Sequence, residues 1–128
     1  MTAPASPGLV SLPSEPDGEK FAKNRKDADA FMRGYMRGVR AYNDAFRKGL
    51  NKDKVIQIIA EQTKNSVDVI ARSFPPGLDP NQKVTLAAFE AYQNFYAEQG
   101  LVRKPIDVKL LLDPSFAEAA VKALGEYK

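Results

Sequence analysis

The chain has 128 residues, of which 44% are apolar and 27% charged, and its formal net charge is +3. These values are ordinary for one globular domain and argue against disorder of the whole chain. The sequence contains no Cys, no His and no Trp, which excludes disulfides, thiolate nucleophiles, zinc fingers and imidazole catalysis. We therefore expect no metal site and no cofactor.

The positive charge is concentrated in one part of the chain. Residues 19–54 hold 11 Lys or Arg against 5 Asp or Glu, whereas residues 55–128 hold 8 against 9. Such an asymmetry is typical either of a surface for an anionic partner or of a solvated helix face. No run of 18 apolar residues is present, so we expect no transmembrane segment.

Residues 1–20 are predicted to form a disordered arm rich in Pro and Ser, and residues 21–128 a single helical domain. The four prolines of the arm remove amide donors every few residues. The arm also lacks the positive start and the long apolar run of a secretory signal peptide. It is therefore left out of the predicted fold.

The strongest helix pattern covers residues 24–46, with Asn24 as the N-cap and Gly49 as the stop. Small residues along one flank predict that another backbone packs close to Gly34 and Gly38. An apolar stripe recurs at three- and four-residue steps, formed by Ala28, Phe31, Tyr35, Val39, Tyr42 and Phe46 and widened by Met32 and Met36.

The candidate site consists of four arginines on the opposite side of this helix. A basic helix face can bind the phosphates of nucleic acid or anionic lipid. Asp44 lies on the same face, however, and no aromatic residue interleaves with the arginines to stack a base. We therefore favour a solvated outer face and expect no nucleic-acid partner. The four residues are Arg33, Arg37, Arg40 and Arg47.

Two shorter helices are predicted next, one capped by Asn51 and ending near Thr63, and one capped by Ser66. The Pro and Gly residues of 75–81 then predict a turn. A further helix is expected over residues 85–100, with aromatic side chains gathered along one broad side.

Residues 106–112 are apolar but short, and the sequence leaves a helical turn and an edge strand open. Ser115 and Glu118 have the spacing of a capping box before the last helix, which Gly125 ends. The buried face of that helix is predicted to hold Phe116, Ala119, Ala120, Ala123, Leu124 and Tyr127. The sequence thus predicts a mostly α chain of four to six helices with little or no strand.

Four segments resemble a known family in the same order. They read FAKNRKD with FMRGYMRGVRAYNDAF at 21–46, GLDP at 77–80, YAEQGLV at 96–102, and DPSFA with ALGEY at 113–127. Together they resemble the C-terminal part of the ABC-transporter substrate-binding proteins for nitrate, sulfonates, taurine and the thiamine pyrimidine precursor. Lys26 stands where that family often has Pro, and residues 81–83 replace a common Asp-Gly turn.

The resemblance implies the helical C-terminal segment of a two-lobed α/β protein that closes around a small solute. It also implies an extracytoplasmic location, an ABC permease as partner and no catalysis. Some relatives make the thiamine pyrimidine by histidine and iron chemistry, which a chain without His and Cys does not favour. Because most ligand contacts of the family precede the matched region, no ligand-binding residue is carried over.

Two outcomes for the fold follow from this resemblance. If the chain is a piece of such a protein, its apolar faces lack their cover and should remain exposed, favouring self-association. If it is self-sufficient, those faces must close on one another as a small bundle. The alternative function is an autonomous helical module that binds a protein or nucleic acid through the arginine face.

Overall fold

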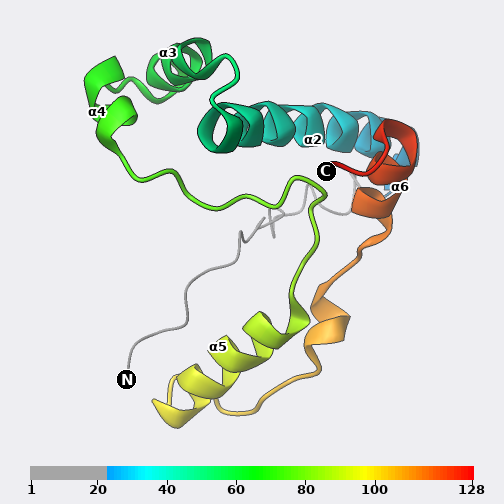
Figure 1. Ribbon diagram of the computed structural model, residues 1–128. Coiled ribbons are helices and arrows are strands. Elements are labelled where there is room, and N and C mark those ends of the chain that lie inside the picture. The colour runs from blue at the N-terminus through cyan, green and yellow to red at the C-terminus, as the bar shows by residue number, and fades with distance from the viewer. Residues whose placement is uncertain (1–22) are drawn as a thin grey trace.

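The structure is a computed structural model that describes residues 23–128. The predicted arm, residues 1–20, lies outside this range. Over the described residues the chain forms five α-helices, one short 3-10 helix and no strand, which confirms the mostly α prediction (Figure 1). The elements are α2 (Arg25–Lys48), α3 (Lys52–Thr63), α4 (Val67–Arg72), α5 (Leu86–Glu98), η1 (Val108–Leu111) and α6 (Ser115–Leu124).

Helix α2 begins and ends where its sequence signals predict. The Asn24 side chain accepts a hydrogen bond from the backbone N–H of Asp27 at 3.3 Å, which satisfies one of the free donors of the first turn. Gly49 ends the helix in the left-handed region at φ +74°, a conformation that costs glycine little.

The buried stripe of α2 differs in part from the predicted one. Its core is formed by Ala28, Met32 and Met36, which pack with Phe116 and Ala120 of α6. The aromatic part of the predicted stripe lies beside this core: Phe31 is 58% exposed, and Tyr35, Tyr42 and Phe46 are half-buried. Both stripes have helical spacing, and the position of α6 decides which one is covered.

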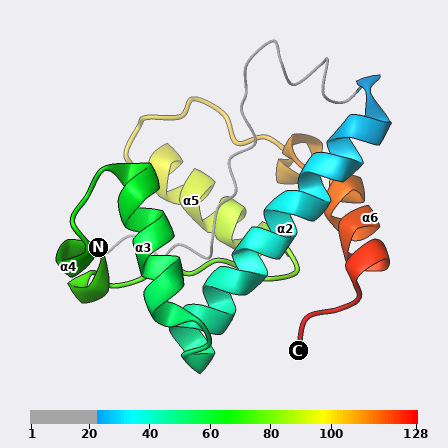
Figure 2. The same ribbon diagram turned by 90° about the horizontal axis from the view of Figure 1, so that it is seen from above.

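Arginines fix α6 alongside α2 at both of its ends. Arg25 donates to the Ser115 hydroxyl at 2.8 Å and to its carbonyl at 2.9 Å, and Arg40 donates to the Gly125 carbonyl at 2.6 Å. Since both contacts follow the order of the chain, the two helices run in the same direction, and Figure 2 shows them side by side.

The N-terminus of α6 departs from the predicted capping box. Ser115 is the first residue of the helix, and the N-cap residue, Pro114, makes no side-chain cap bond. The Ser115 hydroxyl instead accepts from Arg25, and Asp113 accepts a hydrogen bond from the Ser115 backbone N–H at 3.0 Å. The predicted face is also only partly right, because Phe116 and Ala120 are buried but Ala123 is exposed.

The close backbone approach predicted at the small-residue flank of α2 is wrong. A Cβ built on Gly34 or on Gly38 would meet no atom within 4 Å. Neither glycine is therefore required by packing, although each costs about 1 kcal/mol relative to Ala in a helix.

Helix α3 packs against α2 and buries Ile56 and Ala60. Asn51 stands at its start as predicted, but in the left-handed region and without a side-chain cap bond. Ser66 does cap α4, since its hydroxyl accepts from the Val69 N–H at 3.3 Å, and no residue of α4 is buried.

Helix α5 and η1 form a unit of their own, which we call the α5–η1 unit and define as residues 86–112. The Gln93 side chain donates to the Ile106 carbonyl at 2.9 Å and accepts from the Ile106 N–H at 2.8 Å. The segment that the sequence left open is thus a helical turn and no edge strand. In Figure 1 the α5–η1 unit lies apart from α2 and α3.

The described helices do not close on one another as a small bundle. Ten apolar residues of the described part are buried, while twelve large apolar side chains are between 43% and 94% exposed. Large exposed apolar surface marks a site of interaction. Of the two outcomes expected for the fold, the described part of the chain matches the one with uncovered apolar faces.

Candidate functional site

The structure separates the four candidate arginines. Arg37 and Arg47 are exposed and Arg33 is partly exposed, whereas Arg40 points into the chain's own loops. The four do not form one free basic face, which corrects the prediction for Arg40. The physical reason is that residues 80–82 and the C-terminal residues approach α2 at this one arginine.

Arg40 joins three segments that are far apart in sequence. Its guanidinium donates to the Pro80 carbonyl at 3.1 Å, to the Asn81 side-chain oxygen at 2.9 Å and to the Gly125 carbonyl at 2.6 Å. A weaker bond of 3.4 Å reaches the Leu124 carbonyl. The planar fork of arginine supplies several donors in fixed geometry, which lysine does not.

Asn81 pairs with the C-terminal residues beside Arg40. Its side-chain oxygen accepts from the Tyr127 N–H at 2.9 Å, and its amide donates to the Tyr127 carbonyl at 3.2 Å. Asn81 is 9% exposed, so these bonds satisfy an amide that would otherwise be costly to bury. We call Arg40, Asn81 and Tyr127 the Arg40 cluster.

The charges next to this cluster stabilise one another. The Tyr127 hydroxyl donates to Asp44 at 2.6 Å, and the Lys48 ammonium lies 3.1 Å from the same carboxylate oxygen. The hydrogen bonds from Tyr127 and then Lys48 lower the pKa of Asp44 below its ordinary value. Contacts with Tyr127 and Asp44 raise the pKa of Lys48. These contacts therefore favour the carboxylate of Asp44 and the ammonium of Lys48.

A second buried amide supports the loop that leads to the cluster. Asn43 is 1% exposed, and its side chain donates to the Val39 carbonyl at 2.9 Å and to the Leu78 carbonyl at 3.0 Å. The sequence analysis missed Asn43, Asn81 and the role of Arg25. The available signal for Asn43 was a polar residue on the apolar stripe of α2, where a buried amide needs a partner.

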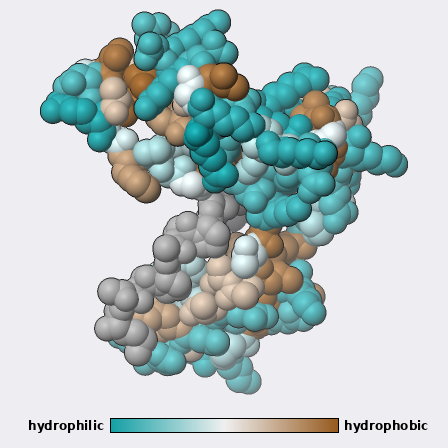
Figure 3. Space-filling view, viewed as in Figure 1, coloured by the Kyte–Doolittle hydropathy of each residue, from teal (hydrophilic) through white to brown (hydrophobic). Residues whose placement is uncertain are grey.

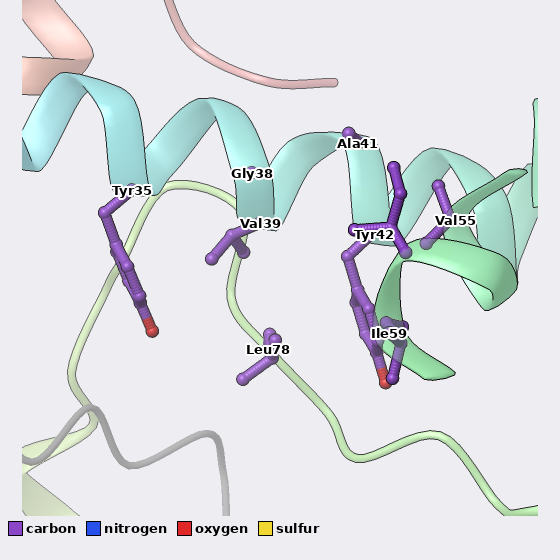
Figure 4. Close-up of a pocket in the computed structure, with 9 residues that line it drawn as sticks. Tyr35, Gly38, Val39, Ala41, Tyr42, Val55, Ile59 and Leu78 are labelled. Atoms are coloured by element: carbon purple, nitrogen blue, oxygen red, sulfur yellow. The ribbon is translucent and has the colours of Figure 1, made fainter. Parts of the chain in front are cut away.

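An apolar hollow of about 420 Å³ lies between α2, α3 and the loop after α4 (Figure 4). Its walls hold no charged side chain, and the Tyr42 hydroxyl donates to the Pro76 carbonyl at 2.9 Å. Burial raises the pKa of Tyr42. Such a lining fits an apolar group and offers no partner for an anion. The lining residues include Tyr35, Val39, Tyr42, Val55, Ile59 and Leu78.

Within residues 23–128 no group of three or more acidic side chains could hold a metal ion. No helix of the same range is both long and apolar enough to cross a membrane. The chain matches no protein family, no curated protein and no solved structure.

Proposed function

We propose that this chain is the helical C-terminal segment of a solute-binding component of an ABC importer. The solute class is small, such as a sulfonate, nitrate or the pyrimidine precursor of thiamine, and the protein is non-catalytic. In this role the chain works outside the cytoplasm and delivers its solute, as part of the whole binding protein, to a membrane permease.

The observation that carries the proposal is that apolar side chains of its helices remain exposed instead of packing against other parts of the chain. Helices that lie on a sheet need one apolar face against that sheet. Here α4 and α5 bury none of their residues, and large apolar side chains stay exposed on both. This is the state expected of helices whose sheet belongs to another part of the protein.

The Arg40 cluster supports the resemblance in a second way. Three of the four resembling segments meet there: Arg40 belongs to 21–46, Pro80 to 77–80 and Tyr127 to 113–127. Arg40 and Tyr127 of the cluster thus come from resembling segments, whereas Asn81, which links them, lies in the stretch 81–83 that departs from the family. The same cluster removes support from the alternative function, because Arg40 is not available to an anionic partner.

The first experiment is to read the DNA upstream of Met1 in all three frames. The proposal expects a frame that encodes a signal peptide and two α/β lobes. A stop codon with a ribosome site of its own, and no lobes upstream, would contradict it.

The second experiment tests binding. The upstream lobes are expressed together with this chain, and the melting temperature is measured with taurine, nitrate and a pyrimidine. We expect co-purification and an increase in melting temperature with one solute class. The lobes without this chain are the matched control. Lobes that fold and bind their solute equally well without the chain would refute a role for it.

A further inference from the structure

The α5–η1 unit is joined to the rest of the described chain by two short linkers. Its two helices contact each other and no other described helix. Figure 3 shows the described residues as an upper and a lower mass, of which the lower one is this unit. Residues 84–85 lead into α5, and Leu112 alone stands between η1 and Asp113. The orientation of the unit therefore depends on what holds the chain just outside these linkers.

The chain after the second linker is held by helix packing. Asp113 accepts a hydrogen bond from the Ser115 N–H at 3.0 Å, and the Ser115 carbonyl accepts from Arg25 at 2.9 Å. Both contacts lie at the start of α6, which packs along α2. This end of the unit is thus fixed to the core that α2 and α6 share.

The chain before the first linker is held by the C-terminal tail, which we define as residues 125–128. The backbone of Tyr127 pairs with the buried Asn81 side chain through hydrogen bonds of 2.9 and 3.2 Å. The Glu126 carboxylate lies 3.2 Å from the ammonium of Lys83, the residue directly before the linker. That ion pair is exposed and weak on its own, so the bonds to Asn81 are the stronger part of the contact.

The tail is fastened to α2 on its other side. Asp44 accepts from the Tyr127 hydroxyl at 2.6 Å, and the Lys48 ammonium donates to the Lys128 carbonyl at 3.2 Å. The same ammonium lies 4.3 Å from the centre of the Tyr127 ring, within the range of a cation–π contact. Because the tail contains no helix or strand, its position depends on these side-chain contacts.

The direct bonds from α2 to the loop before α5 stop short of the linker. Among the described residues, Asn43 reaches the Leu78 carbonyl, and Arg40 reaches Pro80 and Asn81. Of the described residues outside this loop, only those of the tail bond to Lys83. The tail therefore extends the hold of α2 from Asn81 to the start of the linker.

We propose that the C-terminal tail is a strap that sets the orientation of the α5–η1 unit. It does so by fixing the residues from which the first linker departs. When the strap is detached, residues 82–85 are released and the unit turns about its second linker, while α2, α3 and α6 stay packed. The inference rests on the bonds of the tail and is independent of the proposed transport function.

The test is the distribution of distances between two spin labels, measured by double electron–electron resonance on the full 128-residue chain, which has no Cys of its own. One label pair, Arg37→Cys with Glu98→Cys, joins α2 to the end of α5. The other pair, Arg37→Cys with Lys122→Cys, joins α2 to α6. All three residues are exposed. Because α5 is about 20 Å long, a turn of about 30° moves its far end by about 10 Å.

The strap is detached by Glu126→Ala with Tyr127→Pro. These changes remove the ion pair with Lys83, the Tyr127 hydroxyl and the Tyr127 N–H, which proline lacks, and they lie outside every helix. We expect the α2–α5 distribution to shift or broaden by about 10 Å and the α2–α6 distribution to stay unchanged. The matched control is Lys128→Ala, which alters an exposed side chain of the tail but keeps the carbonyl that Lys48 binds. It should leave both distributions unchanged.

Three results would overturn the proposal. The first is an α2–α5 distribution that is the same with the strap attached and detached, whether narrow or broad. The second is equal broadening with Lys128→Ala. The third is equal broadening of the α2–α6 pair, which would mean that the tail supports the packing of the whole chain and does not orient the unit.

Discussion

Replacement of Arg40 tests whether the cluster around it stabilises the fold. In Arg40→Met the apolar stem is kept and the guanidinium is lost, together with bonds of 2.6, 2.9 and 3.1 Å to Gly125, Asn81 and Pro80, which belong to two segments of the chain. Each charge-assisted bond contributes about 1.5–3 kcal/mol, but solvent reaches the partly exposed Arg40 and can replace part of this. We expect a loss of about 2–4 kcal/mol in the free energy of unfolding.

The assay is urea unfolding followed by circular dichroism, with hydrogen exchange to locate the change. Exchange should increase at residues 78–82 and 124–128 and stay unchanged in α3. Arg40→Lys keeps the charge without the fork and should lose about half as much. Arg37→Met is the matched control, since Arg37 is exposed on the same helix, and it should change stability by less than about 0.5 kcal/mol. Equal losses for Arg40→Met and Arg37→Met would refute the reasoning.

Three further substitutions test single features. Asn43→Ala should cost about 1–3 kcal/mol by leaving the Leu78 carbonyl without its donor, and urea unfolding measures this. Tyr127→Phe should raise the pKa of Asp44, observed by NMR titration of its carboxyl carbon. Because the folded-state pKa of Asp44 is lowered, its stabilising contribution is complete above its ordinary pKa of 3.8 and is lost as the pH falls through the lowered value; an unchanged pKa in Tyr127→Phe would contradict the assigned cause. Gly38→Ala should increase the free energy of unfolding by up to about 1 kcal/mol, and so raise the melting temperature, because the added Cβ would meet no atom within 4 Å. A lower melting temperature would mean that another group packs against Gly38.

Helix boundaries were predictable because their signals are local. Asn24, Gly49, Ser66 and Gly125 act within one turn of their own position, and the structure has helices beginning or ending at each of them. A cap of this kind depends on the next three or four residues, which the sequence shows directly. The capping box predicted at Ser115 is absent because a distant residue, Arg25, donates to the Ser115 hydroxyl instead.

Which face of a helix is buried, and which of its side chains bond to distant segments, was not predictable in the same way. Arg40 and Arg37 have the same side chain and lie on the same helix, but only Arg40 meets a turn that lies 40 residues further on. Similarly, Met36 is buried and Phe31 exposed because α6 packs on one of two equally periodic stripes. Such choices depend on long-range contacts that spacing along one helix does not encode.

The packing of α2 against α6 also has a consequence for synthesis on the ribosome. The core partner of Ala28, Met32 and Met36 is the last helix of the chain, about 90 residues later. At a synthesis rate of about 5–20 residues per second, roughly 5–20 s pass between the synthesis of α2 and that of α6. During this time its methionine stripe is exposed to chaperones and to other nascent chains. A premature stop codon before residue 115 would make that exposure permanent.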